Sequence, residues 1–169
     1  MPGKLYLIPT PISTESFHTV PQYIAEAVRD TRLFFVEREK SARGFLKKLN
    51  PRIPLDECQI FSLNEHTPRG EIEKYSRMIL QHNAGVISES GCPCVADPGS
   101  DLVLLAHERD IEVIPFAGPS SILMALMASG LNGQNFAFNG YLPKEREARR
   151  KKIREHRRRG WMRPRRWLR

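Results

Sequence analysis

The sequence predicts an α/β protein built on a mostly parallel sheet with flanking helices. Short apolar runs alternate with helix-like stretches along most of the chain, which is the pattern of strands joined by helical crossovers. Proline and glycine stand at the boundaries between these stretches, where the chain has to turn. In sheets of this kind ligands bind at the loops that follow the carboxyl ends of strands, so a functional site is expected there.

Six apolar runs are predicted as strands. The first is "KLYLI", which is ended by Pro9 and Pro11. The fourth is "GVIS", which leads directly into a loop rich in Gly, Pro and Cys. In chain order the predicted strands cover residues 4–8, 32–37, 58–63, 85–88, 111–116 and 135–143.

Helices are predicted between and after these strands. Pro21 and Pro68 each fit the first turn of a helix, where the missing N–H is tolerated. Gly44 lowers the helix propensity of the second helix, and Gly130 ends the fifth. The predicted helices cover residues 21–30, 39–49, 68–83, 99–110, the later part of 117–130, and 144–155.

The positive charge of the chain is confined to its last segment. The whole chain carries a net charge of +8, but residues 1–143 hold 13 Lys and Arg against 16 Asp and Glu. Residues 144–169 hold 14 Lys and Arg against 3 Glu. A nucleic-acid interaction inferred from the net charge is therefore an inference about this last segment alone.

Composition also limits the class of protein. No apolar run approaches the roughly 20 residues that span a bilayer. The N-terminus is a poor signal peptide because Pro9 and Pro11 break its short apolar run. Three cysteines do not make a disulfide framework. We therefore expect a cytoplasmic protein that has no membrane association.

Three loops carry unusual chemistry at the predicted carboxyl ends of strands. They are "PTPIST" after the first strand, "SESGCPCVADPGS" after the fourth and "AGPSS" after the fifth. The residues of the second loop leave two interpretations open. Its glycines could let a ligand approach the main chain, or it could be only a loop whose Asp97 caps the next helix. The common nucleotide-binding glycine fingerprints are absent.

The polar and thiol side chains of these loops favour some chemistries over others. A single residue separates Cys92 from Cys94, whereas zinc sites space paired cysteines more widely and add a second pair, so no metal site is predicted. Ser120 and Ser121 either meet a polar ligand at a helix N-terminus or only cap that helix. Glu37 and Glu89 follow two strands at the expected functional edge and are the candidate catalytic bases.

Taken in order, four segments resemble the tetrapyrrole-methylase-like superfamily of S-adenosylmethionine-dependent methyltransferases. They are "LYLIPTPI", "SESGCPCVADPG", "VIPFAGPSSI" and "ASGLNGQNFAFNGYLP". Within the superfamily they resemble most the branch that methylates a ribose 2′-hydroxyl of small-subunit ribosomal RNA, together with its shorter relatives. The resemblance runs in unbroken order from residue 3 to about residue 154.

The resemblance implies a fold and a site. Members of this superfamily have two α/β domains with the methyl donor, S-adenosylmethionine, in the cleft between them, and they call for no metal. It further implies an RNA substrate and a homodimer in the intact family form. The residues implied to hold the donor are Ile12, Gly91, Cys92, Pro93, Val95, Ser120, Ser121 and Ile122.

The resemblance also sets the expected domain organisation. Residues 1–116 are expected to form the N-terminal domain, and residues 117–155 the beginning of an incomplete second domain. Residues 156–169 lose the helical pattern and become rich in Arg, Trp and Pro. We interpret them as a frameshift or truncation product, with a basic RNA-binding arm as the alternative.

The sequence therefore predicts an S-adenosylmethionine-dependent methyltransferase that acts on an RNA hydroxyl, with the activity of this short chain left open. Two alternatives remain. One is a methyltransferase for a small molecule such as a tetrapyrrole, and the other is a non-catalytic RNA-binding protein that uses the basic tail.

Overall fold

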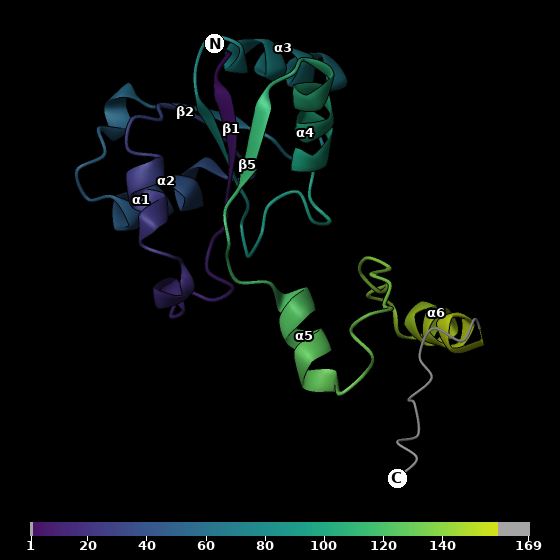
Figure 1. Ribbon diagram of the computed structural model, residues 1–169. Coiled ribbons are helices and arrows are strands. Elements are labelled where there is room, and N and C mark those ends of the chain that lie inside the picture. Colours follow the sequence, from purple (N-terminus) through teal and green to yellow (C-terminus); the bar gives the residue numbers. More distant parts are fainter. Residues whose placement is uncertain (1, 159–169) are drawn as a thin grey trace. The chain divides into compact units, whose positions relative to one another are not determined.

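The computed structural model describes residues 2–158, in which one parallel sheet of five strands is flanked by helices (Figure 1). The predicted α/β class with a parallel sheet is thereby confirmed. The strands lie in the order β3–β2–β4–β1–β5. Their bounds are β1 Lys4–Ile8, β2 Leu33–Val36, β3 Gln59–Ser62, β4 Ala84–Ile87 and β5 Glu112–Pro115.

Each face of the sheet is covered by helices, and each face has its own core. Helices α1 (Tyr23–Ala27) and α2 (Glu39–Leu49) pack on one face, around Phe34 and Leu46. Helices α3 (Arg69–Ile79) and α4 (Gly99–Glu108) pack on the other, around Phe35 and Leu102. Phe34 and Phe35 are neighbours in β2 and enter opposite cores because side chains alternate across a strand.

The central strands end at the same level. Ile87, the last residue of β4, pairs with Ile8 of β1 on one side and with Val36 of β2 on the other. The residues that follow these three strands therefore begin at one edge of the sheet. This register places the loop after β1, Glu37 and the loop after β4 side by side.

The topology makes this edge a natural binding place. β1 continues into the helices on the α1 and α2 face, whereas its neighbour β4 continues into α4 on the opposite face. Adjacent connections that leave to opposite faces open a crevice outside the carboxyl ends of the strands, which is where open α/β sheets bind ligands.

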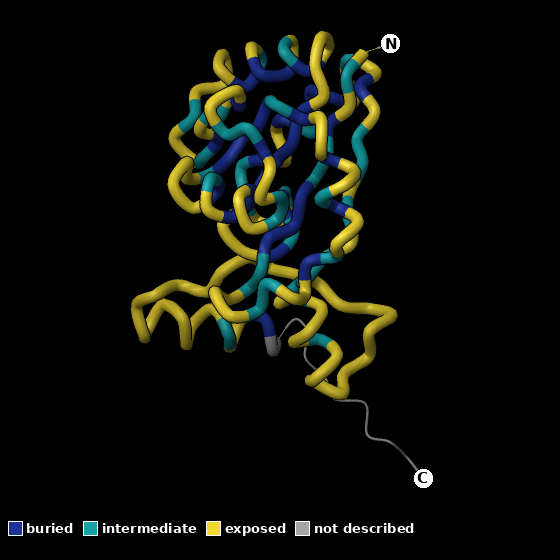
Figure 2. The backbone as a smooth tube through the Cα atoms, turned by 90° about the vertical axis from the view of Figure 1, so that its left-hand side faces the viewer, coloured by how far each residue is buried: buried dark blue, intermediate teal, exposed yellow. Residues whose placement is uncertain are grey.

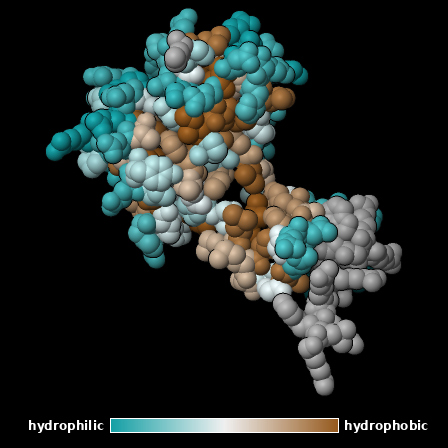
Figure 3. All heavy atoms as spheres, viewed as in Figure 1, coloured by the Kyte–Doolittle hydropathy of each residue, from teal (hydrophilic) through white to brown (hydrophobic). Residues whose placement is uncertain are grey.

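The chain divides into two compact units between Ser120 and Ser121. All the buried apolar residues of the described chain belong to the first unit, and residues 121–155 are almost wholly exposed (Figure 2). The second unit holds α5 (Ser121–Ser129) and α6 (Arg146–Arg158). Figure 3 shows apolar side chains gathered on α5, and its Met127 is 82% exposed.

The strand predicted over residues 135–143 is wrong, because these residues form irregular chain. A strand needs a neighbour to satisfy its backbone N–H and C=O groups, and the described part of the second unit supplies none. The predicted tail is partly helical, since α6 continues to Arg158. The rest of that tail, residues 159–169, lies outside the described residues. No helix among residues 2–158 is long and apolar enough to cross a bilayer.

Candidate functional site

The loops after β1 and β4 are joined directly at the carboxyl edge of the sheet. The backbone N–H of Thr10 donates to the carbonyl of Gly91 at 2.9 Å, and the N–H of Gly91 donates back to the carbonyl of Thr10 at 3.1 Å. The buried hydroxyl of Ser88 donates to the same Gly91 carbonyl at 2.9 Å. Gly91 has a φ of 75°, which glycine adopts without strain. The two loops therefore form one fixed main-chain surface.

The loop after β5 is packed against both of the others. Gly118 lies so close to Pro9 that a Cβ at position 118 would overlap the proline ring. The thiol of Cys92 donates to the carbonyl of Pro119 at 3.4 Å. All three loops singled out in the sequence thus meet at one place, because β1 lies between β4 and β5 in the parallel sheet.

The loop after β4 holds an unusual backbone. Cys94 and Ala96 have φ values of 65° and 58°, in the left-handed region that residues with a Cβ rarely adopt. Such conformations persist only where the surroundings enforce them, and they cluster at functional sites. Asp97 accepts the N–H of Gly99 at 2.7 Å, so its carboxylate serves the start of α4 as one of the two sequence interpretations expects.

The loop thiols are kept protonated. Burial raises the pKa of Cys94 to about 12, and burial also raises the pKa of Cys92. A metal ligand would have to be a thiolate, which both environments disfavour. Among residues 2–158, no three His, Cys, Asp or Glu side chains gather closely enough to hold a metal ion.

The residues expected to hold the donor fall into two groups. In the first unit, the hydroxyl of Ser90 donates to the carbonyl of Ile12 at 3.4 Å, which ties Ile12 to the loop after β4. Gly91 and Pro93 are buried in this loop, whereas Val95 is 47% exposed. Ser120 ends the first unit, and Ser121 and Ile122 open α5 in the second unit.

The two candidate bases lie together but differ in surroundings. The N–H of Glu89 donates to the carboxylate of Glu37 at 3.1 Å. Burial raises the pKa of Glu37, although that hydrogen bond opposes the effect. The carboxylate of Glu89 accepts the hydroxyl of Ser41 and lies 3.9 Å from Arg38.

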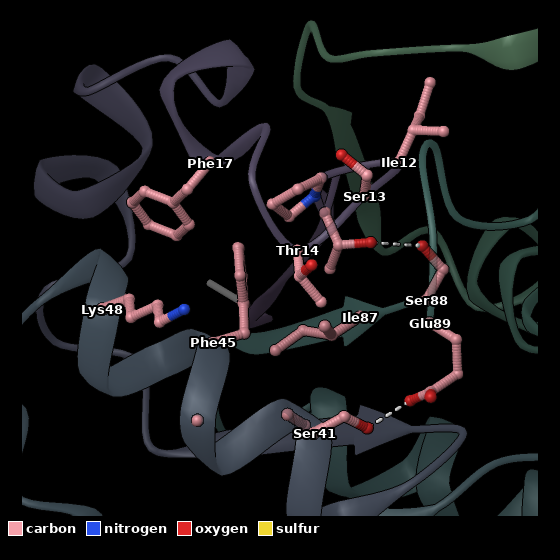
Figure 4. Close-up of a pocket in the computed structure, with 14 residues that line it drawn as sticks. Ile12, Ser13, Thr14, Phe17, Ser41, Phe45, Lys48, Ile87, Ser88 and Glu89 are labelled. Carbon is pink, nitrogen blue, oxygen red and sulfur yellow. Dashed lines mark hydrogen bonds between the residues drawn. The ribbon is translucent and has the colours of Figure 1, made fainter.

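A cavity of about 420 Å³ opens beside these loops (Figure 4). Ile12 and Glu89 line it, whereas Glu37 and the other residues of the predicted site do not. Its walls come from the loop after β1, from one face of α2 and from the end of β4. The remaining lining residues are Thr10, Pro11, Ser13, Thr14, Phe17, Ser41, Ala42, Gly44, Phe45, Lys48, Ile87 and Ser88.

Helix α2 contributes one wall of this cavity, which the sequence motifs did not indicate. Ser41, Gly44, Phe45 and Lys48 recur at positions i, i+3, i+4 and i+7, which places them on one face of the helix. This face mixes polar and apolar residues, so it departs from a plain core stripe. The spacing of these residues was the one sequence signal that could have indicated their role in the cavity. Which way this face of the helix points depends on packing, which the sequence does not show.

The fold is that of an α/β protein in which the loops after β1, β4 and β5 are joined at one edge of the sheet. Curated relatives of the chain include proteins named ribosomal RNA small subunit methyltransferase I. The protein of that name from Vibrio cholerae is 28% identical over 152 residues, which are 89% of this chain and 50% of the relative. The one from Xylella fastidiosa is 30% identical over 90% of this chain and 54% of the relative.

These relatives confirm the resemblance to the methyltransferases that the motifs predict. The chain spans about half the length of the curated relatives it matches. No protein-family model matches it. Among solved structures, a uroporphyrin-III-C-methyltransferase from Thermus thermophilus is similar over 78% of this chain and 55% of the Thermus chain. The TM-score is 0.53 and the sequence identity is 18%. That likeness bears on the fold alone.

Proposed function

We propose that the chain is the portion of an S-adenosylmethionine-dependent methyltransferase that carries the donor loops, and that this enzyme acts on an RNA hydroxyl. The donor loops are the loops after β1, β4 and β5. The observation that carries the proposal is the joining of three loops, "PTPIST", "SESGCPCVADPGS" and "AGPSS", through Thr10, Gly91 and Pro119. Similarity to ribosomal RNA methyltransferases over about nine-tenths of the chain supports the RNA substrate.

The residues present fit this donor. S-adenosylmethionine supplies, when bound, a methyl group on a positively charged sulfur. Ile12 and the exposed Val95 offer apolar surface beside the main-chain atoms of Gly91. A thiolate next to a sulfonium would itself take the methyl group, so the raised pKa values of Cys92 and Cys94 keep these thiols compatible with the donor.

Transfer to a hydroxyl requires position and a base. The acceptor oxygen forms a bond to the methyl carbon while the bond from that carbon to sulfur breaks, leaving a neutral thioether. Holding the two reactants in line supplies much of such a rate. Glu89 is the carboxylate that faces the cavity, and we assign it the acceptor proton in preference to Glu37.

The experiment that tests the substrate class joins this chain to the C-terminal half of the Vibrio cholerae relative. Extracted small-subunit ribosomal RNA and uroporphyrinogen III are offered side by side with S-adenosylmethionine labelled in its methyl group. We expect label in the RNA, and we expect Glu89→Gln to reduce it by at least about a hundredfold. Label in the porphyrinogen alone would contradict the proposal. The cytoplasmic location, the homodimer and the domain boundary at residue 116 stay predictions.

A further inference from the structure

We propose that the cavity between the loop after β1 and α2 receives one nucleoside of the acceptor RNA, with Lys48 binding its phosphate. This inference rests on the proposed function, because the nucleoside is the group that would be methylated. It goes further by naming where the acceptor lies and which residues outside the donor loops select it.

The position of the cavity suits an acceptor. Its lining runs from Thr10 to Glu89, so it is complete within the first unit. Ile12 lines both this cavity and the proposed donor site, and the proposed base, Glu89, also lines the cavity. A group held in the cavity therefore lies next to the loops that would present the methyl group.

The cavity has an apolar part and a hydroxyl-rich part. Phe17 and Phe45 form an aromatic wall, with ring centroids 6.0 Å apart and planes inclined by 58°. Ile87 extends this wall at the end of β4. Unstacked bases of single-stranded RNA are commonly held against aromatic side chains in this way. This part of the cavity offers apolar and aromatic contacts to a base.

The hydroxyl-rich part matches a ribose. The hydroxyls of Thr10 and Ser88 lie 3.5 Å apart and are both buried. Across the cavity the hydroxyl of Ser41 donates to the carboxylate of Glu89 (Figure 4). A carboxylate and several hydroxyls can exchange hydrogen bonds with the vicinal hydroxyls of a sugar. These groups do not match an apolar ligand.

The charge at the cavity favours a single phosphate. Figure 4 shows Lys48 reaching from α2 toward the cavity, and the residue is exposed. Among the described residues that line the cavity, Lys48 is the one cation and Glu89 is the one anion. A tetrapyrrole that carries many carboxylates would need several cations around it. The volume of about 420 Å³ is also near the lower end of small-molecule sites, which run from about 300 to 1,000 Å³.

The test uses two pairs of matched variants. Lys48→Ala removes the proposed phosphate contact, and Lys47→Ala removes the neighbouring exposed lysine of α2, which does not line the cavity. Gly44→Leu adds a side chain at the cavity, where a new Cβ meets no atom within 4 Å. Gly70→Leu makes the same change in α3, where a new Cβ also meets open space. Amide spectra of all four verify that they fold.

The four ribonucleoside 5′-monophosphates are titrated into the isotope-labelled chain, and affinities are read from amide and methyl chemical shifts. We expect shifts centred on Phe45, Ile87 and Glu89 with at least one nucleotide. Lys48→Ala should weaken that binding by about threefold or more, and Gly44→Leu by about tenfold or more, with both controls within about twofold. Shifts at Phe45, Ile87 and Glu89 report on the cavity and are distinct from any binding at the basic residues of the C-terminal segment.

Each outcome decides one claim. If the Lys48 and Gly44 variants bind the nucleotide as tightly as their controls do, the acceptor cavity is overturned. Tighter binding of uroporphyrin III than of nucleotides at the same residues would also overturn it. A parallel titration with S-adenosylhomocysteine reports on the donor loops separately. Nucleotide binding without donor binding would count against the proposed function, and donor binding without nucleotide binding would count against the cavity alone.

Discussion

At the scale of single residues, the carboxylate pair at the sheet edge has a division of roles. Glu37 is half-buried behind the loop and accepts a backbone N–H, whereas Glu89 faces the cavity. Both follow strands that end in register, at Val36 and Ile87. The register of the strands brings the two residues together, and packing decides which carboxylate faces the cavity.

The raised pKa of Glu37 predicts how stability changes with pH. Burial holds the pKa above the ordinary value of 4.5, with the charges of Asp97 and Glu89 acting in the same direction. The protonated form is favoured by folding, so this contribution is present below about pH 4.5 and is lost as the pH rises through the folded-state pKa.

Glu37→Gln should remove that dependence, because the amide oxygen still accepts the N–H of Glu89 but cannot ionise. We expect the free energy of unfolding of the variant, relative to the native chain, to be higher at pH 7.5 than at pH 4.5. Urea denaturation at the two pH values measures the difference. If the difference in free energy of unfolding between the variant and the native chain is the same at both pH values, folding does not change the pKa of Glu37.

At the scale of elements, the close contact between the loops after β1 and β5 can be tested by a single substitution. Gly118→Ala would place a methyl group into the ring of Pro9. We expect a loss of about 1–3 kcal/mol in the free energy of unfolding, which is typical of overpacking. Gly44→Ala is the matched control, since its Cβ meets open space in the middle of α2 and should add about 0.5–1 kcal/mol. Equal effects at both glycines would refute the close contact.

Much of the fold could be predicted from the sequence because local patterns and tertiary structure agree. The apolar run 4–8 and the helix over 39–49 coincide with β1 and α2. Residues 135–143 were predicted as a strand because their apolar residues fit the pattern of a strand. A strand also needs a neighbouring strand to pair with, which this segment lacks in the described chain. The loops of the site were visible as Gly, Pro and Cys clusters. Lys48 and Phe17 were not, because only packing brings them to the cavity.

At the scale of the whole molecule, the first unit carries the core. The buried apolar residues of the described chain run from Leu5 to Ile111, whereas α5 and the residues described after it bury no apolar side chain. The second unit therefore contributes little of the apolar burial that stabilises the described fold.

A chain of residues 1–120 should accordingly fold alone. We expect it to unfold cooperatively, with a midpoint temperature within about 4 °C of that of the full chain. Circular dichroism during heating compares the two. A fragment that is unfolded at room temperature would mean that residues beyond Ser120 stabilise the sheet through contacts that their exposure does not suggest.

If the three joined loops hold a methyl donor, the isotope-labelled chain should bind S-adenosylhomocysteine at these loops in a titration. We predict weak binding, because the chain spans about half the length of the curated relatives it matches. The largest amide shifts should fall on Ile12, Gly91 and Cys92. Amides of these loops that stay unchanged at millimolar ligand, or shifts confined to other parts of the sheet, would contradict the account.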